Sequence, residues 1–127
     1  MPDYRLREAA DLLGVSDDTA RRWADAGRFP TSTDPTGHRC VAGADLAAFA
    51  AAQADAAAPT TSSMRNRFAG IVTKVVRGDV AAQVEVHAGP HRFVALLTAE
   101  AVDTLDLKPG DRAVATVKAT NVAVDLP

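Results

Sequence analysis

The sequence predicts an α+β protein built from two small domains. In the first 50 residues, apolar positions recur at helical spacing, and Gly14 and Gly27 each follow a helical segment. From Met64 onward, apolar and polar residues alternate with a period of two, as in β-strands. A segment rich in Ala, Pro, Thr and Ser lies between the two patterns. We therefore predict one domain over residues 1–50, a linker over residues 51–62 and a second domain over residues 63–127.

The composition is that of globular protein, with 47% hydrophobic and 24% charged residues among 127. Domains of this size have thin cores, so we expect a homo-oligomer. Residues 1–49 contain six arginines and eight acidic residues, so DNA binding would depend on individual arginines and not on bulk charge. The single cysteine, Cys40, excludes an intrachain disulfide. With no signal peptide and no apolar run long enough to span a bilayer, we expect a cytoplasmic protein without membrane contact.

The N-terminal domain reads as two helices followed by a turn-rich segment. Residues 4–13 predict a helix that Gly14 ends in a left-handed conformation. Ser16 is the expected N-cap of a second helix over residues 17–26. Residues 28–41 predict a hairpin or wing, and a third helix begins at Gly43. The Ala-rich half of the linker could continue that third helix until Pro59.

Three sequence features of this domain occur in the order found in one family of DNA-binding proteins. Residues 6–16 precede the segment Thr19-Ala20-Arg21-Arg22-Trp23, and Gly37-His38-Arg39 follows in the wing. This arrangement resembles the MerR/excisionase-type winged helix-turn-helix. The resemblance implies that the second helix enters the major groove of double-stranded DNA and that the wing contacts its backbone or minor groove. The candidate DNA-binding residues are Ser16, Asp18, Thr19, Arg21, Arg22, His38 and Arg39.

Other interpretations of these residues stay open. Trp23 lies at helical spacing and favours a core position over base stacking. His38 could shape the wing instead of touching DNA. Cys40 stands where relatives often carry a basic residue, and Asp17 and Asp18 place acids in the recognition helix. The alternative hypothesis is a degenerate module that mediates protein contacts.

The C-terminal segment predicts a small OB-like β-barrel. Residues 69–76 and 80–86 form an expected hairpin, and residues 91–98 a third strand. A short helix is expected over residues 99–105. A Pro-Gly turn then leads into strands over residues 112–118 and 121–125. Five short strands with one helical turn are typical of small barrels of the OB type.

Motifs spread through this whole segment resemble those of the molbindin (Mop/TOBE) family. They are Ser63-Met64-Arg65-Asn66, Thr98 at the end of a strand, the turn Leu107-Lys108-Pro109-Gly110-Asp111, and Lys118-Ala119-Thr120. The resemblance implies a ligand, molybdate or tungstate, bound as an oxyanion between subunits. It also implies a homo-oligomer, a hexamer arranged as a trimer of dimers, because each chain carries one copy. The candidate oxyanion-binding residues are Ser63, Met64, Arg65, Asn66, Thr98, Lys118, Ala119 and Thr120.

The chemistry of these residues suits a tetrahedral dianion. Arg65 and Lys118 supply positive charge, and Ser63, Thr98 and Thr120 supply hydroxyl donors. Backbone N–H groups near Met64 and Ala119 add short-range donors. The sequence contains no general base, nucleophile triad or metal-ligand cluster beside them, so we expect binding and neither catalysis nor a metal site. In the alternative interpretation, Arg65 and Asn66 only fix the strand entry and Lys118 is solvated.

Other polar residues give weaker signals. His87 and His91 flank a turn, and without further ligands a histidine pair is usually solvated. Cys40 with His38 falls two ligands short of a structural zinc site.

Together the two resemblances predict a molybdate- or tungstate-responsive transcriptional regulator, similar in function to ModE-type regulators. The alternative is an intracellular molybdate/tungstate storage or buffering protein whose helix-turn-helix mediates protein contacts.

Overall fold

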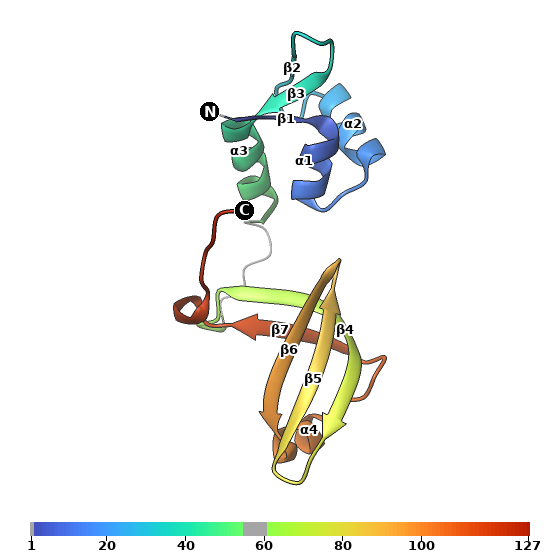
Figure 1. Ribbon diagram of the computed structural model, residues 1–127, viewed down its shortest axis with the longest axis vertical. Helices are drawn as coiled ribbons and strands as arrows, with labels where there is room; N and C mark the ends of the chain where they lie inside the picture. The colour runs from blue at the N-terminus through green and yellow to red at the C-terminus, as the bar shows by residue number, and fades with distance from the viewer. Residues whose placement is uncertain (1, 55–60) are drawn as a thin grey trace. The chain divides into compact units, whose positions relative to one another are not determined.

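The computed structural model of the protein describes residues 2–54 and 61–127 (Figure 1). The two ranges belong to two separate units, each with its own hydrophobic core. The first unit combines three helices with a small sheet, and the second is a curled antiparallel sheet with one α-helix. The predicted α+β class is thereby confirmed. Within the described ranges, no helix has both the length and the apolar character needed to cross a membrane.

The N-terminal unit packs its helices against a three-stranded antiparallel sheet. The strands lie in the order β1-β3-β2, and Tyr4 of β1 pairs with Val41 of β3 while Ser32 of β2 pairs with Cys40. The predicted wing is the hairpin formed by β2 and β3. Along the chain the elements are β1 (Asp3–Arg5), α1 (Leu6–Leu13), α2 (Asp17–Asp25), β2 (Ser32–Thr33), β3 (Arg39–Ala42) and α3 (Gly43–Ala54).

The ends of the helices show where local sequence decides structure. Gly14 has φ 70°, the predicted left-handed conformation after α1, and Ser16 caps α2 by accepting a hydrogen bond from the Thr19 N–H at 3.1 Å. The helix predicted from Tyr4 begins only at Leu6, because residues 3–5 are extended and pair with β3.

The predicted linker is partly helical. The Ala-rich sequence continues α3 as far as Ala54, so residues 51–54 belong to the helix. Residues 55–60 lie outside the described residues, and so does the predicted end of the helix at Pro59.

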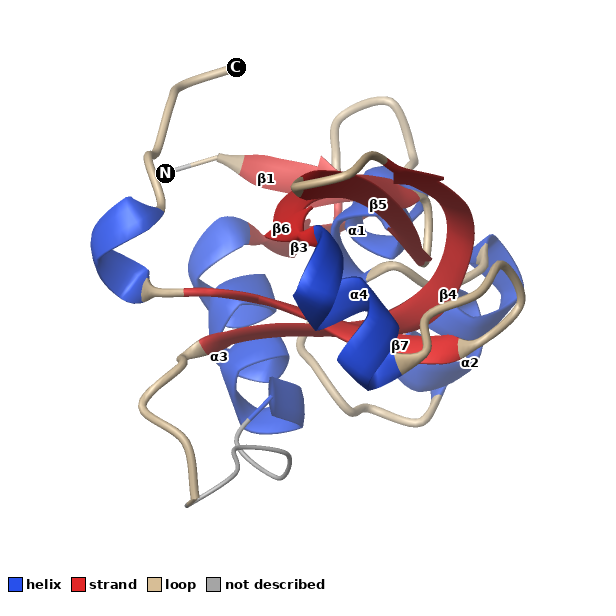
Figure 2. Ribbon diagram, turned by 90° about the horizontal axis from the view of Figure 1, so that it is seen from below, coloured by secondary structure: helices blue, strands red, loops and turns tan. Residues whose placement is uncertain are grey.

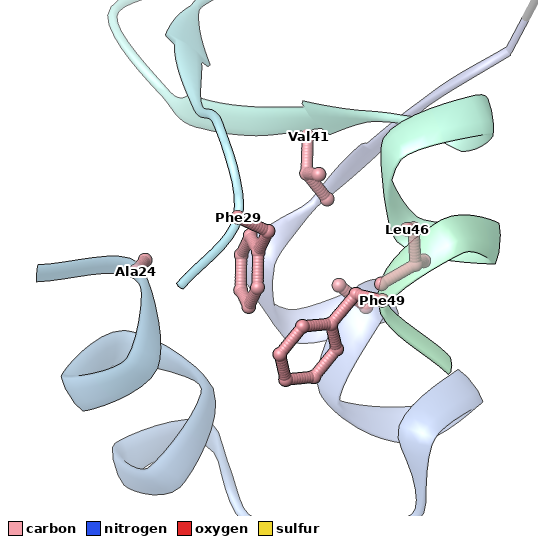
Figure 3. Close-up of a cluster of buried hydrophobic side chains, with 6 residues drawn as sticks. Ala24, Phe29, Val41, Leu46 and Phe49 are labelled. Atoms are coloured by element: carbon pink, nitrogen blue, oxygen red, sulfur yellow. The ribbon is translucent and has the colours of Figure 1, made fainter. Parts of the chain in front are cut away.

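Aromatic rings form the centre of the N-terminal core. The Phe49 ring centroid lies 5.1 Å from that of Phe29 and 5.3 Å from that of Trp23. The buried cluster also contains Val41, Leu46, Ala9 and Ala24. Figure 3 shows Ala24, Phe29, Val41, Leu46 and Phe49 in close-up. Trp23 is thus part of the core, as its helical spacing indicated.

The C-terminal unit is a four-stranded antiparallel sheet in the order β6-β5-β4-β7. Its elements are β4 (Asn66–Arg77), β5 (Ala81–Ala88), β6 (His91–Thr98), α4 (Ala99–Leu105), β7 (Arg112–Val117) and a 3₁₀ turn (Ala119–Asn121). The prediction of a fifth strand over residues 121–125 is wrong. Asn121 belongs to the 3₁₀ turn, and residues 122–127 pair with none of the described strands. Their alternating apolar side chains are left open, with Val124 89% and Leu126 92% exposed.

The long strand β4 bends and thereby curls the sheet, as Figure 2 shows. Its first half pairs with β7 and its second half with β5, and the register shifts between Val72 and Lys74. The curl brings Phe68 of β4 onto Phe93 of β6, with ring centroids 4.6 Å apart. Val102 of α4 packs into the resulting core beside Val72 and other valines.

Gly70 lies where β4 crosses the end of β5. A Cβ atom at this position would lie 2.1 Å from the carbonyl oxygen of His87 and 2.7 Å from its carbonyl carbon. Only glycine allows two backbones to approach this closely.

Candidate functional site

Two of the predicted oxyanion-binding segments meet at one end of the curled sheet. Asn66 begins β4 and pairs with Val117, the last residue of β7. The Asn66 side chain reinforces the pair, because its Nδ2 donates to the Val117 carbonyl oxygen at 3.1 Å. Arg65 therefore precedes the first paired residue of β4, and Lys118 follows the last paired residue of β7, at the same end of two neighbouring strands. We call residues 62–66 and 118–120 the cationic corner.

Ser62 organises the entry to β4. The Met64 N–H donates to Ser62 Oγ at 3.1 Å, and Arg65 Nη1 donates to the Ser62 carbonyl oxygen at 3.2 Å. On the other strand, the Asn121 N–H donates to the Lys118 carbonyl oxygen at 2.9 Å and so starts the 3₁₀ turn. Sequence reasoning missed Ser62. The sequence could have indicated it only through the tendency of a serine hydroxyl to accept from the backbone N–H two residues later, as in serine turns.

The cationic corner carries two positive charges, those of Arg65 and Lys118. Within residues 2–54 and 61–127, neither Arg65 nor Lys118 forms a salt bridge. Three other cations of the same unit do: Arg77 with Asp103, Arg92 with Glu85, and Lys108 with Asp106. Among the described residues, Arg67, Lys74 and Arg112 also form no salt bridge, so it is the placement of Arg65 and Lys118 at the ends of two paired strands that distinguishes them. Like charges at neighbouring positions on two strands repel each other. A bound dianion would remove this repulsion and accept hydrogen bonds from both side chains.

Thr98 lies at the opposite end of β4 from this corner. It pairs with Ala81, which begins the strand after β4, and its Oγ1 caps α4 by accepting from the Ala101 N–H at 3.0 Å. Since β4 has 12 residues, its two ends are separated by a contour of roughly 35–40 Å. One chain thus gathers all the predicted oxyanion-binding residues except Thr98.

The predicted DNA-binding residues lie on α2 and in the wing. At the start of α2, Ser16 Oγ donates to Thr19 Oγ1 at 3.0 Å, and Arg22 Nη2 donates to the same oxygen at 3.2 Å. Arg21 Nη1 lies 3.8 Å from Oδ1 of Asp18, three residues earlier on the same helix. In the wing, Arg39 Nη1 forms an ion pair with Asp25 of α2, and its Nε donates to Thr31 Oγ1 at 3.2 Å. Arg39 thereby ties the wing to the second helix.

The second helix and the wing border a pocket of about 400 Å³. We call it the arginine pocket, and its lining is Arg5, Leu6, Arg7, Arg21, Asp25, His38 and Arg39. Sequence reasoning missed Arg5 and Arg7, because the start of α1 reaches the wing only through the pairing of β1 with β3. It also missed Asp25 of α2, whose partner Arg39 lies 14 residues away in the sequence.

Asp34 shapes the wing loop. Its Oδ1 accepts hydrogen bonds from Thr36 Oγ1 at 2.7 Å, from the His38 N–H at 2.8 Å and from the Thr36 N–H at 2.9 Å. The Thr36 hydroxyl and these backbone donors lower the pKa of Asp34 from 3.8 to about 2. His38 Nδ1 is itself hydrogen-bonded to Thr36 Oγ1 at 2.8 Å, so His38 takes part in shaping the wing.

We expect the ionised Asp34 to stabilise the N-terminal unit only above its folded pKa. Because folding lowers this pKa, the stabilisation is complete above about pH 4 and is lost as the pH falls towards 2. The Asp34→Asn variant should therefore lose less stability than the wild type over this range. Thermal unfolding followed by the fluorescence of Trp23, the single tryptophan, measures the effect. The control is Asp11→Asn on the surface of α1, and equal acid sensitivity of Asp34→Asn and wild type would contradict the assignment.

Both units are similar to known protein families. The sequence profile of the TOBE domain matches residues 62–124, and that of a helix-turn-helix domain matches residues 4–54. The "Molybdenum transport protein ModE" of Herbaspirillum seropedicae is 38% identical over 64 residues, which are 50% of this chain. The chain spans only 24% of the length of that relative.

Solved structures match the C-terminal half. A molybdate-binding protein from Sporomusa ovata is 36% identical with a TM-score of 0.51, covering 53% of this chain and 100% of its own. MopII from Clostridium pasteurianum is 28% identical with a TM-score of 0.49, covering 52% of this chain and 100% of its own. The curled sheet thus resembles the TOBE/molbindin fold, and both resemblances predicted from the sequence are confirmed. The chain belongs to the TOBE-domain family and carries a helix-turn-helix domain in its N-terminal half.

Proposed function

We propose that this protein binds molybdate or tungstate through its C-terminal unit and DNA through its N-terminal unit, and that it regulates transcription in response to the oxyanion. The observation that carries the proposal is that Arg65 and Lys118 flank the paired residues Asn66 and Val117, while neither cation forms a salt bridge among residues 2–54 and 61–127. It lies in a domain that is 36% identical to a molybdate-binding protein along that protein's whole length. The same chain contains a helix-turn-helix domain.

In the proposed site, Arg65 and Lys118 contribute the charge that balances the dianion. The hydroxyls of Ser63 and Thr120 and the backbone N–H groups near Met64 and Ala119 donate to its oxygens. Asn66 holds the two strands together through its bond to Val117. Molybdate and tungstate are both tetrahedral dianions, so we propose the same site for either.

We further propose that the site is shared between subunits of a homo-oligomer, a hexamer arranged as a trimer of dimers. Thr98 can join the cationic corner only from a neighbouring chain, because its own chain places it at the other end of β4. The C-terminal unit also leaves apolar side chains exposed on β6 and after the 3₁₀ turn: Val94, Leu96, Val122, Val124 and Leu126. A second copy of the chain would cover them.

For DNA binding, we propose that α2 enters the major groove and that the wing contacts the backbone. Ser16, Asp18, Thr19, Arg21 and Arg22 lie on or before the first turns of α2, and His38 and Arg39 lie in the wing. The acidic residues of this unit favour weak binding by each module, which several modules on one oligomer would compensate. We place this activity in the cytoplasm, where a free thiol such as that of Cys40 persists.

A storage or buffering protein is the second candidate. The observation that favours it is the pairing of four N-terminal arginines with aspartates of the same unit, which reduces the charge available to DNA. In that case the helix-turn-helix would contact protein instead of DNA.

Selection from a random duplex library, followed by titration of the best duplex, separates the two functions. For a regulator, saturating molybdate should change the DNA affinity by roughly fivefold or more, since allosteric coupling is commonly of this size. Bound DNA should change the molybdate affinity by the same factor. Sulfate at equal ionic strength is the control. If no duplex is enriched, or if molybdate leaves the DNA affinity unchanged, the regulator proposal fails and storage is favoured.

A further inference from the structure

The arginine pocket joins three parts of the N-terminal unit that are distant in sequence. Arg5 and Arg7 come from the start of α1, Arg21 and Asp25 from α2, and His38 and Arg39 from the wing. Four arginine residues thus line one pocket beside the second helix. Guanidinium groups bind phosphate through paired hydrogen bonds, which makes arginine the usual residue for this contact.

Every arginine of the pocket already has an aspartate partner. Arg5 lies 3.8 Å from Asp34, Arg7 lies 4.0 Å from Asp17, and Arg21 lies 3.8 Å from Asp18. These pairs are long, and all of their side chains except that of Asp34 are more than half exposed, so each is weak and readily exchanged for another anion. The pair of Arg39 with Asp25 is different. It is hydrogen-bonded, and Asp25 itself lines the pocket.

We propose that the arginine pocket binds a backbone phosphate of duplex DNA, and that Asp25 competes with this phosphate for Arg39. The inference rests on the proposed DNA binding and adds to it two contacts, Arg5 and Arg7, and one opposing group, Asp25. A carboxylate and a phosphate accept hydrogen bonds from the same donors, so Arg39 exchanges one for the other when DNA binds. Contacts of this kind fix the register of a protein on the duplex and carry no sequence information.

The substitution Asp25→Asn tests the competition. The amide keeps an oxygen that can accept from Arg39 but removes the negative charge from the pocket. We expect the full chain to bind the selected duplex roughly three- to tenfold more tightly, as measured by fluorescence anisotropy. The matched control is Asp11→Asn. It removes the same charge near the C-terminal end of α1, outside the lining of the arginine pocket. Equal affinity of Asp25→Asn and Asp11→Asn would overturn the competition.

The salt dependence of binding tests the phosphate contact. Each arginine that contacts a phosphate adds about 0.9 to the magnitude of the slope of log K against log salt concentration. Arg5→Ala and Arg7→Ala should each reduce that magnitude by about this amount on specific and on unrelated duplexes alike. Lys74→Ala, which removes an exposed cation from β4 of the C-terminal unit, is the control and should leave the slope unchanged.

The outcomes distinguish this inference from the proposed function. If the wild type binds no duplex at low salt, the DNA-binding function itself fails. If the wild type binds but Arg5→Ala and Arg7→Ala retain its slope, DNA binding stands and the phosphate pocket is refuted. Trp23 fluorescence establishes that each variant is folded, because Trp23 packs in the core of the same unit.

Discussion

Replacing Arg65 or Lys118 by alanine is expected to weaken molybdate binding by roughly ten- to a hundredfold for each substitution. Each change removes a charge-assisted donor and half of the local charge that balances the dianion. The double variant should show no saturable binding. Isothermal titration calorimetry of the full chain with molybdate, tungstate and sulfate measures the effect, and molybdate and tungstate should bind wild type with similar affinity.

A matched control for this experiment is Arg112→Ala. It removes one positive charge from the first residue of β7, at the opposite end of the strand from Lys118, and should retain wild-type affinity. Arg65→Lys should bind molybdate better than Arg65→Ala, because it keeps the positive charge. It should bind less tightly than the wild type, because lysine lacks the paired donors of a guanidinium. Unchanged binding in both alanine variants would refute the cationic corner as the site.

Gly70→Ala is expected to destabilise the C-terminal unit by about 3 kcal/mol or more, at the upper end of the usual cost of overpacking. The added methyl would lie 2.1 Å from the His87 carbonyl oxygen, and its neighbours are backbone atoms, which no change of side-chain rotamer can move. One of the two crossing strands would have to shift and break its pairing. Denaturant unfolding followed by far-ultraviolet circular dichroism measures the loss, while Trp23 reports on the N-terminal unit separately.

Gly89→Ala provides the comparison for this variant. Gly89 has a positive φ of 57°, but a Cβ there would meet no heavy atom within 4 Å. Its substitution should therefore cost only the backbone strain of a left-handed alanine, about 1 kcal/mol. If Gly70→Ala unfolds no more easily than Gly89→Ala, the close crossing of β4 over β5 is not the reason for glycine at position 70.

The features predicted well from the sequence are those that short segments decide. Ser16 and Gly14 mark helix ends through bonds and dihedral angles within a few residues. The helix predicted over residues 99–105 has the bounds of α4, and Thr98 caps it. The β4–β5 hairpin follows from alternation on both sides of a turn.

The errors fall where a distant partner decides the conformation. Tyr4 and Arg5 continue the helical pattern of α1, yet they are extended because Val41 and Cys40 pair with them. Residues 122–126 alternate as a strand would, but the four described strands of their unit offer them no pairing. A period-two pattern shows that a segment has one apolar face that could be buried. It does not identify the strand that would pair with the segment.

The sequence by itself determined the two-part organisation, the class of each part and the family of each, because periodicity and ordered motifs are carried by the chain alone. It also named the residues of the proposed oxyanion site. Only the tertiary structure decided which of them meet: the pairing of Asn66 with Val117 brings Arg65 to Lys118, while Thr98 stays at the far end of β4. The arginine pocket has the same origin. The β1–β3 pairing brings residues from the start of α1 to the wing, and contacts between residues far apart in sequence leave no local pattern to read.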